Sequence, residues 1–169
     1  SAGSSNVANG YQSLYSNTTG GNNVASGYES LYSNTTGGDN DAYGYRTLFV
    51  NTTGFGNVAN GYQSMMGNTT GFLNTATGYR SLFLNTTGSN NTANGDQSLY
   101  SNSTGTANVG VGVFSARGNS VGNNNTAVGF SAMANNTTSD ITAVGYLALN
   151  NNTTGNFNTA IGNQALIEN

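Results

Sequence analysis

Few side chains in this sequence have the chemistry that catalysis or metal binding needs. The chain has no histidine and no cysteine, and its only cationic side chains are Arg46, Arg80 and Arg117. General acid–base catalysis and nucleophilic catalysis both need a positioned side chain that titrates or ionises. The remaining carboxylates and hydroxyls are scattered along the chain. We therefore expect no catalytic residue and no enzyme activity.

The closest pair of carboxylates is Asp39 and Asp41, two residues apart in an Asn- and Gly-rich segment. Two carboxylates can serve as the acid and the nucleophile of a glycosidase, but a solvated turn explains this pair more simply. Asp39, Asp41 or Asp140 could also hold one calcium ion weakly. Calcium-binding β-rolls place an Asp in every repeat. Because Asp is too rare here for that, we expect neither a metal site nor a cofactor.

The charge pattern excludes two classes of partner. Proteins that bind nucleic acid cluster Lys and Arg to contact phosphates, and this chain has only three arginines in 169 residues, with a net charge of −3. A membrane-spanning helix needs about 20 consecutive apolar residues, and no run approaches that length. We predict no nucleic-acid partner and no membrane insertion.

These residues sit in a repeat whose period is marked by glycine. The recurrent glycines are Gly10, Gly27, Gly44, Gly61, Gly78, Gly95, Gly112, Gly129, Gly145 and Gly162. Their spacing is 17 residues, broken once by a spacing of 16 that we assign to a deletion between Ser139 and Ala143. Fixed periods of this length are typical of solenoids. We predict a single repeat domain over residues 1–169, with ten 17-residue coils and no separate caps.

Within each coil, the side chains alternate as they do in a strand. Counting from the recurrent glycine as position zero, alanine lies at position −2 and leucine or methionine at +4, as in Ala76 and Leu82 around Gly78. Alternation of period two predicts strands, and the Asn-Thr-Thr-Gly that follows predicts a turn. We therefore expect two short strands and two turns per coil. The predicted fold is an all-β, parallel β-solenoid (a β-roll) with equivalent residues stacked one above another.

An aromatic residue usually follows the glycine, on the strand face opposite alanine and leucine. This predicted face, for contact with another chain or a ligand, consists of Tyr11, Tyr28, Tyr45, Tyr62, Tyr79, Phe130 and Tyr146. Ordering 17 residues costs about 25 kcal/mol, which requires roughly 1,000 Å² of buried apolar area per coil. An interior of Ala and Leu cannot supply that area. We therefore expect a second chain to cover the aromatic face in a homo-oligomer. Because equivalent residues stack, we also expect asparagine and tyrosine ladders between coils.

The Asn-Thr-Thr-Gly turns also contain glycosylation sequons. The candidate acceptors are Asn17, Asn34, Asn51, Asn68, Asn85, Asn102, Asn136 and Asn152, with further sequons at Asn90, Asn124, Asn135 and Asn151. A good turn sequence explains the motif without a glycan, but a row of sugars is the alternative. The threonine rows also suggest ice binding. That function usually needs Thr-x-Thr, whereas Thr18 and Thr19 are adjacent and would point to opposite sides of a strand.

The C-terminal third contains Asn125-Thr-Ala-Val-Gly129, Ile141-Thr-Ala-Val-Gly145 and Asn158-Thr-Ala-Ile-Gly162. This pattern resembles the head repeats of trimeric autotransporter adhesins (the YadA-like head), and repeat tracts in bacterial and phage tail-fibre-type proteins. The resemblance implies a left-handed parallel β-roll, three chains packed together and a role in surface attachment. It also implies that the aliphatic residue before the glycine points inward. The residues at that position are Val111, Val128, Val144 and Ile161, whereas the earlier coils mostly have polar residues there.

These patterns predict a structural protein that is extracellular or at the cell surface. Asn169 followed by Ser1-Ala2-Gly3 recreates a turn close to Asn102-Ser-Thr-Gly105, which predicts subunits that stack head to tail into a fibre. The alternative is a ligand-binding adhesin head or a phage tail-fibre shaft. Its repeated Asn, Thr and Tyr face would bind a cell-surface glycan or protein by avidity.

Overall fold

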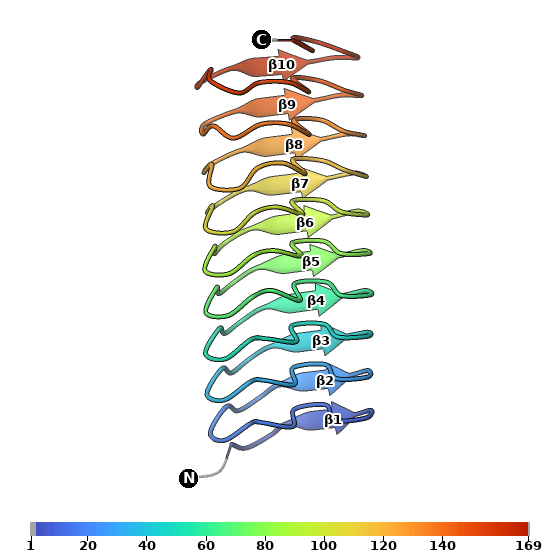
Figure 1. Cartoon of the computed structure of the whole chain (residues 1–169), viewed down its shortest axis with the longest axis vertical. Helices are drawn as coiled ribbons and strands as arrows, with labels where there is room; N and C mark the ends of the chain where they lie inside the picture. The colour runs from blue at the N-terminus through green and yellow to red at the C-terminus, as the bar shows by residue number, and fades with distance from the viewer. Residues whose placement is uncertain (1–2, 169) are drawn as a thin grey trace.

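The computed structural model describes residues 3–168, and these residues form a rod of stacked coils (Figure 1). Each coil contributes one strand of three residues to a single ten-stranded parallel sheet in chain order. The strands are β1 (Val7–Asn9), β2 (Val24–Ser26), β3 (Asp41–Tyr43), β4 (Val58–Asn60), β5 (Thr75–Thr77), β6 (Thr92–Asn94), β7 (Val109–Val111), β8 (Thr126–Val128), β9 (Thr142–Val144) and β10 (Thr159–Ile161). The described residues contain no helix. The predicted parallel β-solenoid is confirmed.

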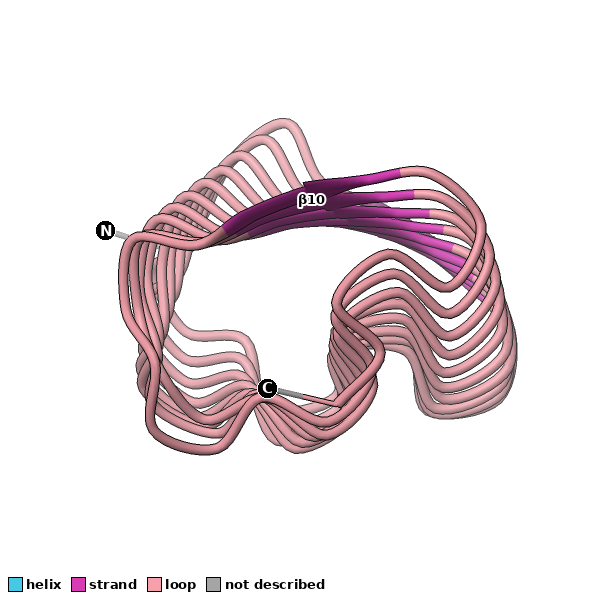
Figure 2. Cartoon of the chain, turned by 90° about the horizontal axis from the view of Figure 1, so that it is seen from above, coloured by secondary structure: helices cyan, strands magenta, loops and turns pink. Residues whose placement is uncertain are grey.

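Equivalent residues of successive coils lie directly above one another. Ala59 pairs with Ala76 and Ala76 with Ala93. In Figure 2, seen from the C-terminal end, the chain runs clockwise from the strand through the lobe on the right while it rises toward the viewer. The coil is therefore left-handed. The predicted joint between Asn169 and Ser1-Ala2 lies outside the described residues.

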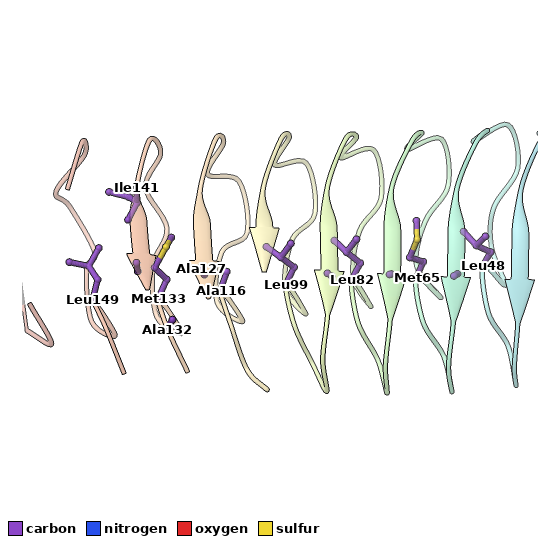
Figure 3. Close-up of a cluster of buried hydrophobic side chains, with 14 of the residues drawn as sticks. Leu48, Met65, Leu82, Leu99, Ala116, Ala127, Ala132, Met133, Ile141 and Leu149 are labelled. Atoms are coloured by element: carbon purple, nitrogen blue, oxygen red, sulfur yellow. The ribbon is translucent and has the colours of Figure 1, made fainter. Parts of the chain in front are cut away.

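The core is a stack of alanines facing a stack of leucines and methionines. In most strands the central residue points inward and its two neighbours point outward, so Ala76 is fully buried between exposed Thr75 and Thr77. Leu82 and Met65 are also fully buried. Figure 3 shows this column of large side chains following the strands from coil to coil. Both inward columns agree with the sequence prediction.

The second predicted strand does not form. After each recurrent glycine the chain makes tight turns, with positive φ at the second and fourth residues, as at Arg80 (φ 51°) and Leu82 (φ 49°). The left-handed conformation costs about 1 kcal/mol per non-glycine residue, but it breaks the two-residue alternation. Ser81 and Leu82 can therefore both face the interior, and both are fully buried. The serine column was not predicted to be part of the core.

Glycine is required where the coils approach most closely. Gly78, a recurrent glycine, has a φ of 127°, and a Cβ atom there would lie 2.6 Å from the carbonyl oxygen of Gly95. Gly71 closes an Asn-Thr-Thr-Gly turn, and a Cβ atom there would lie 2.4 Å from both Asn68 Oδ1 and the Gly88 carbonyl oxygen. Neither position has space for a side chain.

Two asparagine ladders run through the interior. At position +7, Asn68 Nδ2 donates to Asn51 Oδ1 of the preceding coil at 2.8 Å and to the Gly71 carbonyl at 3.0 Å. At position −4, Asn74 donates to Asn57 Oδ1 through its backbone N–H (3.0 Å) and through Nδ2 (3.1 Å). Both columns are buried along most of the rod. The predicted amide ladders are confirmed, and they lie inside the coil.

The interior contains more than the predicted alanine and leucine columns. Each internal coil also buries a serine, threonine or alanine and at least one asparagine, as in Ser81 and Asn85. Buried amides that are fully hydrogen-bonded do not carry the cost of unpaired polar groups. A second chain covering the aromatic face stays a prediction.

The short coil lacks one turn glycine, and its strand nevertheless stays in register with its neighbours. Thr126 of β8 pairs with Thr142 of β9 although they are 16 residues apart. The carbonyl of Thr138 accepts from Asn125 Nδ2 (2.8 Å) and from Asn136 Nδ2 (3.0 Å), as the turn glycine does elsewhere. The deletion therefore lies between Thr138 and Ser139, a little before the predicted place, and it leaves side-chain parity unchanged.

Replacement of Leu82 by alanine should destabilise the rod far more than the same change two residues later. Leu82 is fully buried, so Leu82→Ala leaves a cavity and should lower the free energy of unfolding by about 2–5 kcal/mol. Leu84 is 44% exposed, and Leu84→Ala should change it by less than about 1 kcal/mol. Urea unfolding followed by circular dichroism measures both. Equal losses would contradict the assignment of the core.

Loss of one amide from the position +7 ladder should be costly. Asn68→Ala removes the donor to Asn51 Oδ1 and the acceptor of Asn85 Nδ2, both of which stay buried. We expect a loss of about 1–3 kcal/mol in the free energy of unfolding. Asn60→Ala is the control because Asn60 is exposed on the outer face of β4, and it should have almost no effect. Thermal unfolding of the two variants side by side tests this, and a neutral Asn68→Ala would refute a structural role for the ladder.

Candidate functional site

The predicted aromatic face is present on the outside of the rod as a continuous stack of rings. From Tyr11 through Tyr28, Tyr45 and Tyr62 to Tyr79, neighbouring ring centroids are 5.0–5.4 Å apart and nearly parallel. After a gap, Phe130 and Tyr146 stack at 5.7 Å. The predicted members other than Tyr45 expose 42–60% of their surface, and Tyr45 is half-buried. Because the ring faces cover one another, the face presents ring edges to the outside.

A second aromatic column lies beside the first, four residues further along each coil. Tyr15, Tyr32 and Phe49 stack at 5.2 Å, as do Phe83 and Tyr100. These residues were not among the predicted members of the aromatic face. The sequence did contain a sign that the two columns form one surface, because Arg46 and Arg80 each lie between an aromatic residue of one column and an aromatic residue of the other.

Two of the three arginines, Arg46 and Arg80, lie between the two aromatic columns. The Arg46 guanidinium carbon is 5.4 Å from the Tyr45 ring centroid and 5.1 Å from that of Phe49. Arg80 lies 5.1 Å from Tyr79 and 5.2 Å from Phe83 in the same way.

Arg117 differs, because it lies five residues after its recurrent glycine and follows Tyr100 in the second aromatic column. Its guanidinium carbon lies 5.6 Å from Tyr100 and 5.5 Å from Phe114. Cation–π contacts of this length each contribute about 0.5–1 kcal/mol at exposed sites. All three cations of the chain therefore belong to one surface, which we call the aromatic–arginine face.

Each arginine donates its Nε–H to an acceptor in the coil below. Arg46 donates to Glu29 Oε2 at 2.6 Å, in the only ion pair among the described residues. This hydrogen bond raises the pKa of Arg46, while burial, together with the Glu29 carboxylate, raises the pKa of the Tyr28 phenol.

The other two arginines have neutral acceptors. Arg80 donates to Gln63 Oε1 at 2.9 Å and Arg117 to Gln97 Oε1 at 3.1 Å. Their positive charges therefore have no carboxylate partner among the described residues.

The carboxylates considered as a catalytic pair or calcium ligands are held by amides of the preceding coil. Asp39 Oδ1 accepts from Asn22 Nδ2, and Asp140 Oδ1 from Asn124 Nδ2, both at 3.0 Å. Asp41 lies at the start of β3 and is half-buried. Over residues 3–168, no three acidic side chains come together as a metal site would need.

Most of the candidate glycosylation asparagines are interior residues. Asn34, Asn51, Asn68, Asn85, Asn102, Asn136 and Asn152 are all fully buried, and Asn17 in the first coil is half-buried. A glycan on Nδ2 would have to fill a space that the next coil occupies. The sequons at Asn90, Asn124, Asn135 and Asn151 are exposed instead.

Within the Asn-Thr-Thr turns, Thr69 Oγ1 donates to the Thr86 carbonyl at 2.9 Å while Thr70 is exposed.

The aliphatic residues that the resemblance placed inward point outward. Val111, Val128 and Val144 end their strands half-buried, and Ile161 is 70% exposed. The inward prediction is wrong for this chain, because the central residue of each strand (Ala127 in β8, for example) fills the interior and its neighbours must face outward.

No protein-family model matches this chain, and comparisons with curated proteins and with solved structures give no match either. Among the described residues, no helix is long and apolar enough to cross a membrane, and no pocket is found. A partner of the described rod would therefore have to bind its surface.

Glycans should be confined to the exposed sequons in any folded product. When the chain is secreted through a glycosylating eukaryotic host, we expect peptide mapping to find glycans at exposed sites such as Asn90 and none at Asn68. Chains modified at a buried asparagine cannot close the coil and should be retained. Folded, secreted protein with a glycan on Asn68 would contradict the buried ladder.

Proposed function

We propose that the chain is a non-enzymatic structural protein: a subunit or segment of an extracellular β-solenoid fibre that stacks head to tail and supports surface attachment. The observation that carries this proposal is the repetition of one coil-to-coil interface along the rod. Strand pairing, asparagine ladders and ring stacking recur between successive coils with the same partners.

This interface is heterologous, since the upper side of one coil fits the lower side of the next. Contacts of this kind produce open filaments when the rotation between units does not close a ring. Nothing in the geometry of an internal coil limits how many can stack. Stability then grows with each added neighbour, as in other solenoids.

The first and last described coils expose positions that are buried in internal coils. Ala8 is exposed, whereas Ala25, its equivalent in the next coil, is fully buried. At the other end, Leu166 is 47% exposed, while Leu149 before it is fully buried. These surfaces fit another coil, which further polypeptide or a second copy of the chain can supply. Either would bury these positions as they are buried in internal coils.

Electron microscopy of the purified 169-residue chain tests elongation. We expect filaments longer than a single rod, with an axial repeat near 4.8 Å in diffraction. Ala8→Lys places a charge on the open surface of the first coil and should suppress elongation. Asn60→Lys, on the outer face of a central coil, is the matched control and should leave it intact. Short rods that never elongate at any concentration would refute the fibre.

A further inference from the structure

The charges of the aromatic–arginine face follow a period of two coils. Its arginines come from the coils that begin with β3, β5 and β7: Arg46, Arg80 and Arg117. Their acceptors come from the coils of β2, β4 and β6: Glu29, Gln63 and Gln97. Because coils stack about 4.8 Å apart, successive guanidinium groups are about 10 Å apart along the rod.

Each guanidinium has donors to spare. Within residues 3–168, the hydrogen bonds of the three arginines run through Nε, which leaves the two terminal nitrogens free to meet an anion. Arg117 is exposed and Arg80 is half-buried. Arginine recognises carboxylates through paired N–H groups, and a guanidinium held against rings is already oriented for that contact.

The two aromatic columns flank Arg46 and Arg80. Tyr79 exposes 42% of its surface, and Phe83 on the other side is half-buried. The side chains between them lie deeper, since Gln63 and Glu29 are each only 8% exposed. An extended chain laid along the rod would thus have ring edges on both sides at Arg46 and Arg80, and a positive charge at every second coil from Arg46 to Arg117. Beside Arg117 the first column holds Asp96 and Val113 in place of rings.

We infer that the aromatic–arginine face binds an extended, β-linked acidic polysaccharide of the uronate type. Such a chain is a flat two-fold ribbon, so its carboxylates point to the same side at every second sugar. Its rise per sugar is close to one coil spacing. The repeat of its carboxylates therefore matches the repeat of the arginines. This inference rests on the proposed role of the fibre in surface attachment and names the class of surface.

Two acidic side chains in the face reduce its positive charge. Glu29 neutralises Arg46, so Arg80 and Arg117 should supply most of the attraction. Asp96 takes the place of a tyrosine in the β6 coil, with one buried carboxylate oxygen that has no hydrogen-bond partner among the described residues. Its coil lies between those of Arg80 and Arg117, and Arg117 reaches down to Gln97, the next residue after Asp96.

Binding is tested with the full chain and three soluble polymers of matched length. β-Linked polymannuronate should bind at low salt, and binding should weaken from about 10 mM to about 1 M NaCl as the charges are screened. α-Linked polyguluronate has the same charge per sugar but a shorter repeat and should bind less tightly. Neutral β-linked mannan should bind least. Equal binding of all three, or no binding of polymannuronate at low salt, would overturn the inference.

Variants assign the binding to named residues. Arg80→Gln with Arg117→Gln should weaken polymannuronate binding at least about tenfold, because two charge-assisted contacts are lost. Glu29→Gln should strengthen it, because it frees Arg46. Glu29→Gln with Arg46→Gln leaves the charge of the face unchanged and should bind within about twofold of the parent. If the arginine pair does not fold, Arg80→Lys with Arg117→Lys keeps the charge and should still lose affinity.

The outcomes also separate this inference from the fibre proposal. Filaments of the Arg80→Gln, Arg117→Gln variant that no longer bind polymannuronate would support both. Unchanged binding by that variant would overturn the polysaccharide site, whatever the filaments show. If the parent chain instead buries this face against a second copy, light scattering will show lateral dimers and polymannuronate will not bind, which also overturns it.

Discussion

Every side chain inside this rod must tolerate its own equivalent as a neighbour about 5 Å away. Backbone hydrogen bonds between parallel coils fix that spacing, as in any parallel sheet. Asparagine satisfies the constraint because its amide both donates and accepts, so Asn68 bonds upward and downward to identical residues. Aromatic rings satisfy it by stacking, and glycine by having no side chain. A column of like charges would instead repel by about 1–3 kcal/mol per step. The constraint explains why only 5% of the residues are charged.

The hydrogen bonds between coils at this spacing offset the strain of the backbone turns. Each coil closes in about 17 residues by placing residues such as Arg80 and Leu82 in the left-handed region, at about 1 kcal/mol or more each. Those turns direct Ser81 and Leu82 to the interior together. They also turn the chain back toward the strand side of the coil, where the ladder asparagines donate hydrogen bonds to the carbonyls of the turn glycines. Local strain is thus offset by hydrogen bonds that exist only when a second coil is in place. This makes neighbouring coils depend on one another.

The sequence was sufficient for the period, the parallel stack, the alanine and leucine columns and the ring stacking, because these follow from repetition and alternation. It was insufficient for the interior asparagines. A polar residue in a turn motif is ordinarily assigned to the surface, and only the vertical pairing of Asn51 with Asn68 makes burial favourable. The family resemblance also placed Val128 inward, because a family pattern does not show that this strand is only three residues long. The second aromatic column was visible in the sequence, but the turn that brings Phe83 beside Tyr79 was not.

The pattern of the aromatic–arginine face is itself a consequence of stacking. Arginine directly above arginine is unfavourable, so each cation has an acceptor in the coil below. The column between the aromatic rings alternates accordingly from Glu29 to Gln97. A cation can then recur no more often than every second coil. The constraint that stabilises the rod therefore also sets the distance between its charges. A surface with that spacing discriminates between polymers by their repeat as well as by their charge, and adding coils multiplies the contacts without changing any one of them.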